Sequence, residues 1–83
     1  NTVIQRKINV TADWQRLSAE RLIGTFDISC PPSNAGNVIF EGDDGSEIPW
    51  VASEFHCFFR VNLADIRIKG TVGDVVTVIG GTW

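Results

Sequence analysis

Residues Leu22–Cys30 read LIGTFDISC. The even-numbered positions of this segment are apolar or glycine, whereas Thr25, Asp27 and Ser29 alternate with them. Successive side chains of a β-strand point to opposite faces, so this period of two predicts a strand with one buried face. The segment sets the class of the domain, because similar short runs occur on both sides of it.

The runs that follow are separated by turn signals. A loop rich in proline and glycine over 31–36 precedes the apolar run 38–40, and 43–45 is Asp-Asp-Gly, which tolerates the backbone angles of a tight hairpin. The returning segment 47–51 contains Pro49, which has no N–H to donate. We therefore expect Pro49 on an edge strand or at a bulge.

Three more runs lie toward the C-terminus. Alternation over 55–61 predicts one apolar face offset from His56, Phe58 and Arg60, and 66–69 alternates isoleucine with basic residues. The run 75–79 is almost entirely apolar, which leaves open a strand buried on both faces. The apolar face predicted for the first of these runs consists of Phe55, Cys57, Phe59 and Val61.

Together these patterns predict an all-β protein with seven or eight short strands, arranged as a compact antiparallel β-sandwich or a jelly-roll-like barrel. Ile4, Ile8 and Val10 indicate an N-terminal strand or arm over 1–12, followed by a single β-sandwich domain over 13–83. Residues 13–22 allow two interpretations, a short helix capped by Asp13 or an extended segment.

Size and charge exclude several classes of protein. A chain of 83 residues forms one domain, and its net charge of −3 with basic residues mostly scattered singly does not suit a nucleic-acid partner. No apolar run approaches the length that spans a bilayer, so we expect no membrane partner. The segment Asn1–Gln5 lacks a signal-peptide pattern and an initiator methionine, so we expect processing but no export signal.

The residues that could carry chemistry do not form a recognisable site. His56 is the single histidine, and its neighbour Cys57 would point to the opposite face of the same strand. We therefore predict no catalytic residues, no cofactor and no metal. The acidic residues of 43–47 are interpreted as a solvated turn and not as calcium ligands. Cys30 and Cys57 are predicted to be two unbridged thiols buried in the core.

Three tryptophans are the most informative residues for binding, since tryptophan is prominent at interface hot spots. Trp83 ends the sequence behind two glycines, where the indole either folds back on the core or docks on another chain. Trp14 and Trp50 are expected at the core or its margin. The candidates for contact with a partner are Val3, Ile4, Trp14, Trp50 and Trp83.

The second half of the chain, from Gly42 onward, carries a family resemblance. Residues 62–70 read NLADIRIKG and residues 73–78 read GDVVTV. This pair of segments resembles the closing strands of small bacteriophage virion proteins, which decorate or cement the head or sit as accessory parts of the particle.

The resemblance implies a non-enzymatic structural protein that binds the major capsid protein or another virion protein, as a homo-oligomer on a particle assembled in the host cytoplasm. The residues themselves are compatible with such a role, because many copies of a small β module can attach through edges and terminal arms. The alternative is a small ligand-binding sandwich of the carbohydrate-binding type, with Trp14 or Trp50 as a stacking platform.

Overall fold

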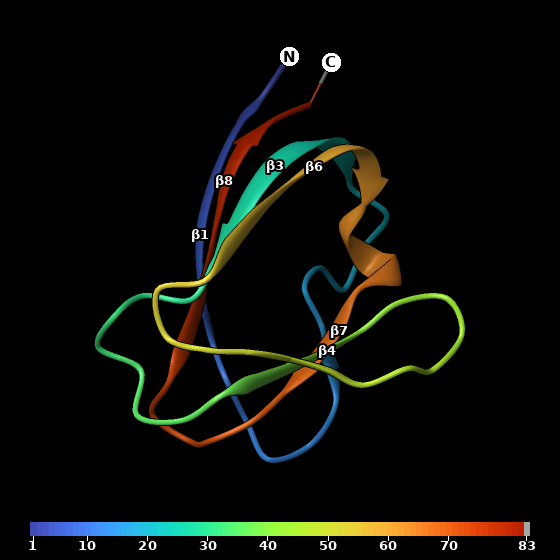
Figure 1. The fold of residues 1–83 in the computed structure, drawn as a ribbon. Helices are drawn as coiled ribbons and strands as arrows, with labels where there is room; N and C mark the ends of the chain where they lie inside the picture. The colour runs from blue at the N-terminus through green and yellow to red at the C-terminus, as the bar shows by residue number, and fades with distance from the viewer. Residues whose placement is uncertain (83) are drawn as a thin grey trace.

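The computed structural model describes residues 1–82, which form two antiparallel sheets of four strands each (Figure 1). The long sheet has the order β1-β8-β3-β6 and the short sheet the order β2-β7-β4-β5. The strands of the long sheet are β1 (Val3–Asn9), β8 (Val75–Gly81), β3 (Ile23–Ser29) and β6 (Phe55–Asn62). Those of the short sheet are β2 (Gln15–Arg16), β7 (Arg67–Lys69), β4 (Val38–Glu41) and β5 (Ile48–Trp50). The single-turn 3₁₀ helix η1 (Leu63–Asp65) links β6 to β7.

The prediction of an all-β sandwich is confirmed. The inner faces of the two sheets enclose one apolar core, to which both sheets contribute alternate residues. On β3 the alternation holds over the whole strand, since Gly24, Phe26 and Ile28 are buried while Asp27 is exposed. The buried apolar residues are Ile4, Val10, Leu17, Phe26, Ile28, Cys30, Val38, Phe40, Trp50, Leu63, Ile68, Val76 and Val78.

The predicted hairpin is also confirmed. Strands β4 and β5 pair antiparallel with Phe40 opposite Ile48, and Gly45 in the connecting turn has a φ of 81°. Only glycine adopts this angle without strain, so the turn depends on it. Pro49 lies on β5 at the edge of the short sheet, where its missing N–H leaves no inner ladder bond unmade.

The two segments for which the sequence left two interpretations open, 1–12 and 13–22, are both extended. Residues 13–22 contain the short strand β2 and no helix. The N-terminal segment is a strand, because β1 pairs with β8 along its whole length, from Val3 opposite Gly81 to Asn9 opposite Val75. The first and last strands of the described residues therefore lie side by side (Figure 1). Among the described residues, none belongs to a helix of the length and apolarity that crossing a membrane requires.

The apolar face predicted for β6 is wrong. Phe55, Cys57 and Phe59 are exposed, whereas Phe58 packs against the core and Val61 does so after an interruption. The interruption is a β-bulge, where the pairing with β3 shifts register between Gly24 and Phe26. The extra residue restores the inward direction for Val61, so a single period of two cannot describe the whole strand.

Two further expectations need correction. Cys30 and Cys57 are both unbridged, but only Cys30 is buried, because Cys57 belongs to the outward-pointing set of β6. Strand β8 is not buried on both faces, since Val76 and Val78 are buried while Ile79 is 52% exposed. The outer side of the long sheet is open because no helix or loop of the described residues covers it.

Asn62 and Asp74, which lie in the two segments that resemble virion proteins, accept hydrogen bonds from loop backbones. Asn62 Oδ1 accepts hydrogen bonds from the backbone N–H groups of Leu22 and Ala64, both at 3.0 Å. The buried carboxylate of Asp74 accepts from Ala35 at 2.8 Å and from Gly36 at 2.9 Å. These bonds satisfy backbone donors of the loops, so both residues serve the fold.

Candidate partner-binding surface

The outer side of the long sheet carries a group of exposed apolar side chains. Val3 is 78% exposed, Phe55 69%, Phe59 75% and Ile79 52%, and Cys57 is exposed beside them. We call these five residues the exposed sheet face. Isolated apolar residues are normal on a surface, but a contiguous group on one sheet marks a candidate for contact with another molecule.

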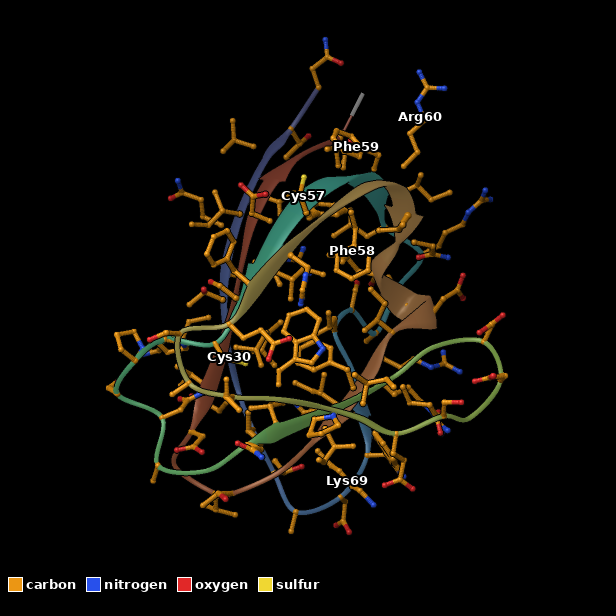
Figure 2. The ribbon with its side chains drawn as sticks, in the orientation of Figure 1. Cys30, Cys57, Phe58, Phe59, Arg60 and Lys69 are labelled. Atoms are coloured by element: carbon orange, nitrogen blue, oxygen red, sulfur yellow. The ribbon has the colours of Figure 1, made fainter. Side chains whose placement is uncertain are left out.

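The ladder of the long sheet brings these residues together from three strands. Asp27 on β3 lies opposite Cys57 on β6 and opposite Ile79 on β8, so both are direct neighbours of Asp27 on the sheet. Figure 2 shows Cys57 and Phe59 on one side of β6 and Phe58 on the other. Polar residues lie on the same side of the sheet, because Asp27 separates Cys57 from Ile79 and exposed Gln5 lies opposite Ile79 on β1.

A β-bulge within β6 directly follows Phe59. Arg60 has a φ of 55°, in the left-handed region, and its N–H donates to Thr25 Oγ1 at 3.4 Å. A side chain in this region costs about 1 kcal/mol or more, which the surrounding sheet offsets. Because the bulge follows Phe59, this ring stays on the outer side of the sheet while the next residues turn toward the core.

The outer side of the short sheet has a different character. Trp14 is half-buried there, with Lys69 Nζ at 4.6 Å and Arg67 Cζ at 5.3 Å from its ring centroid. Arg67 also forms a salt bridge with Glu41, and Lys69 Nζ lies 3.7 Å from Glu47. Charges of opposite sign therefore neutralise one another within this cluster, and the indole already has cations against its face.

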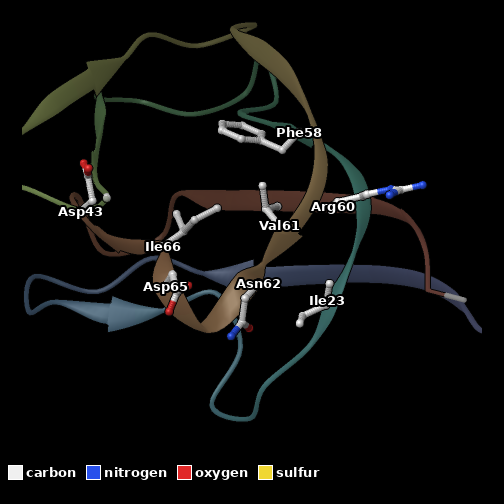
Figure 3. Close-up of a pocket in the computed structure, with 9 residues that line it drawn as sticks. Ile23, Asp43, Phe58, Arg60, Val61, Asn62, Asp65 and Ile66 are labelled. Atoms are coloured by element: carbon white, nitrogen blue, oxygen red, sulfur yellow. The ribbon is translucent and has the colours of Figure 1, made fainter.

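An open groove of about 630 Å³ lies between the turn after β4 and the end of β6 (Figure 3). Phe58, Val61 and Ile66 give it apolar walls, while Asp43 and Asp65 contribute carboxylates. Its full lining is Ile23, Gly42, Asp43, Phe58, Arg60, Val61, Asn62, Asp65 and Ile66. The groove therefore offers apolar contact beside two carboxylates.

A cluster of aromatic rings surrounds Trp50. Trp50 stacks on Phe40 with centroids 3.6 Å apart, and His56 meets the indole edge-on at 4.8 Å. Glu54 Oε2 lies 2.8 Å from His56 Nε2. The hydrogen bond from His56, followed by one from the Val51 N–H, lowers the pKa of the Glu54 carboxyl. These contacts give His56 a positioning partner and an aromatic neighbour.

Both thiols are held in their protonated form at neutral pH. Burial, with the nearby charges of Glu54 and Asp74, raises the pKa of Cys30 to about 11. A hydrogen bond to Asp27 is the main cause that raises the pKa of Cys57. Since the thiolate is the reactive form, both environments oppose nucleophilic chemistry. In residues 1–82, no three His, Cys, Asp or Glu side chains lie close enough to hold a metal ion.

The five residues proposed for partner contact do not lie together on one surface. Val3 is exposed, but Ile4 is 6% exposed and Trp50 is 4% exposed, so these two belong to the core and not to a surface. Trp14 lies in the charged cluster of the short sheet, away from the exposed sheet face. Trp83 lies outside the described residues.

Sequence reasoning missed Phe55, Phe59 and Ile79 as surface residues. One signal could have identified part of this set: Phe58 and Phe59 are adjacent, and adjacent strand residues point to opposite faces. One of the two rings had to face outward wherever β6 formed a strand. Choosing which one required the register with β3, which the sequence of β6 does not contain.

Comparisons of this chain with protein-family models, with curated proteins and with solved structures found no match.

Proposed function

We propose that this chain is a non-enzymatic structural protein of a bacteriophage particle, which binds the capsid shell as a decoration, cement or accessory protein. The proposal combines the resemblance of the closing segments with the surface described above. The observation that carries it is the exposed sheet face, because its apolar side chains are available for burial against a larger protein surface.

Burial of the exposed apolar side chains would supply enough free energy for weak attachment of each copy. Complete burial of one exposed Phe or Ile side chain contributes about 1.5–3 kcal/mol. Losses of motion and of hydration reduce this gain, so a single copy would bind weakly. Many copies on a symmetric shell would multiply weak contacts into stable attachment. Phe55, Phe59 and Ile79 supply the apolar area, and the Asp27 carboxylate among them supplies one polar contact.

The carbohydrate-binding alternative has less support. A sugar-binding platform needs an aromatic ring with an open face, whereas Trp50 is buried under Phe40 and Trp14 has Lys69 and Arg67 against it. The exposed rings are Phe55 and Phe59, which lack a polar handle for hydroxyl groups.

Ile79→Asp tests the proposed surface. Ile79 lies on β8, not on β6, which borders the groove. A charge at Ile79 should reduce co-sedimentation with particles recovered from the source material by about tenfold or more. The matched control is Ile48→Asp, because Ile48 is 54% exposed on the short sheet and Ile79 is 52% exposed on the long sheet. The control should bind normally. Equal binding by both variants, or a loss confined to Ile48→Asp, would contradict the assignment.

A further inference from the structure

Strand β6 lies at the edge of the long sheet, and no strand within residues 1–82 pairs with its outer side. The N–H of Cys30 donates to the carbonyl oxygen of Glu54 at 2.8 Å, which fixes the phase of the ladder. Backbone groups alternate in direction along an antiparallel strand, so the even-numbered residues before the bulge bond to β3. The backbone groups of Phe55, Cys57 and Phe59 therefore point to the open side.

The other three sheet edges are protected against pairing with a second chain. Strand β2 has two residues, and β5 has three, one of which is Pro49. Strand β1 is longer but exposes the adjacent cations Arg6 and Lys7. Short length, proline and lysine are the usual features that block edge pairing. Strand β6 has eight residues and none of these features before Arg60.

The sequence of β6 is complementary to itself. When two copies pair antiparallel about a two-fold axis at Cys57, Phe55 lies opposite Phe59 of the other copy, and Cys57 lies opposite its own equivalent. All three have their backbone groups at the open side, so each opposed pair can exchange two hydrogen bonds. Phe55 and Phe59 also share the outer face, where aromatic pairs across strands contribute roughly 0.2–1 kcal/mol each.

The register of this pairing is set by the aromatic residues of the regular part of β6. Moving the axis by one residue, to His56, places Phe55 opposite Cys57, so the aromatic match is lost. The bulge after Phe59 ends the regular strand, which limits the pairing to a short segment.

We propose that two copies of this chain associate through β6, antiparallel and centred on Cys57, to form one eight-stranded sheet. Such an interface is isologous, because each copy uses the same surface. The pairing occurs at the edge and leaves the exposed sheet faces of both copies on one side of the joined sheet. The inference stands apart from the proposed function, because it concerns the purified chain alone.

Oxidative cross-linking tests the position of the axis. Opposed residues of a hydrogen-bonded pair have Cα atoms about 5.5 Å apart, within the range that a disulfide spans. Diamide takes up the two electrons and two protons that two Cys57 thiols lose, and a covalent dimer forms. We expect this dimer from the wild-type chain and from Cys30→Ser, but not from Cys57→Ser. A covalent dimer from Cys57→Ser, or none from the wild type, would overturn the register.

Sedimentation equilibrium under reducing conditions tests the association without a covalent bond. Phe59→Asp should weaken dimerisation by about tenfold or more, because it replaces one ring of each aromatic pair with a carboxylate. Val72→Asp is the matched control, since Phe59 and Val72 are both 75% exposed and Val72 lies on a turn away from β6. Denaturant midpoints verify that each variant is folded.

The oligomeric state of the wild-type chain tests the association as a whole. A wild-type chain that stays monomeric at millimolar concentration would overturn the inference. An open-ended series of oligomers would do the same, because a two-fold contact closes at the dimer.

Discussion

The Asp74 carboxylate accepts a hydrogen bond from the backbone N–H of Gly36 at 2.9 Å, between residues 38 positions apart in the chain. Its other oxygen accepts from Ala35, and Asp74 is 4% exposed. Replacing Asp74 by Ala leaves two loop donors without a partner, so we expect a loss of roughly 3 kcal/mol in the free energy of unfolding. Urea denaturation measures it. Asp65→Ala, at an exposed position, should change stability by less than about 0.5 kcal/mol.

The aromatic stack predicts different costs for two tryptophans. Trp50→Ala removes a buried ring that contacts Phe40, His56 and Phe58, and should cost about 3–5 kcal/mol. Trp14→Ala removes a half-buried ring with cation–π contacts and should cost less than half as much. Unfolding followed by circular dichroism compares the two. Equal losses would mean that Trp50 does not hold the sheets together as described.

Gly80 cannot accept a side chain. A Cβ atom there would lie 2.0 Å from the carbonyl oxygen of Thr25 and 2.8 Å from the Phe26 Cα, and both atoms belong to the backbone of β3. Gly80→Ala must therefore separate β8 from β3 and should cost about 2 kcal/mol or more. Gly42→Ala is the control, because nothing lies within 4 Å of a Cβ at Gly42. A thermal melt that does not distinguish the two variants would contradict the close approach of the strands.

Stability should fall at alkaline pH because of Cys30. Burial raises the pKa of this thiol from 9.0 to about 11, so above pH 9 the unfolded chain releases the proton before the folded chain does. The contribution is fully present below pH 9 and is lost as the pH rises toward 11. Denaturant midpoints measured across this window should decline in the wild type. Cys30→Ala should flatten the decline, and an unchanged slope in that variant would assign it to other groups.

Local alternation was sufficient to predict the class of the fold and several of its elements. The period of two at Phe26 and Ile28, the Gly45 turn and the edge position of Pro49 follow from residue chemistry that acts within a few positions. Each of these features constrains the backbone whatever the remote neighbours are. This is why they could be predicted before the sheet order was known.

The exposed sheet face could not be predicted in the same way. The direction of Phe59 depends on the register between β6 and β3, which places Phe58 opposite Phe26 on the inner face. The exposure of Ile79 depends on which side of β8 faces the short sheet. Trp50 was expected at the core or its margin and was also a contact candidate; its stacking on Phe40 and its 4% exposure confirm the first expectation and not the second. Pairing between distant segments decided all three cases.

The neighbouring ends of the chain have a mechanical consequence. The N–H of Thr82 donates to the carbonyl oxygen of Thr2 at 2.9 Å, at the point where β1 and β8 begin their antiparallel pairing. A force that pulls these two ends apart acts across the ladder and loads one hydrogen-bonded pair at a time, so the strands would peel apart at low force. The same proximity allows a short linker to join the ends, so that the chain could be reopened at an exposed turn as a circular permutant.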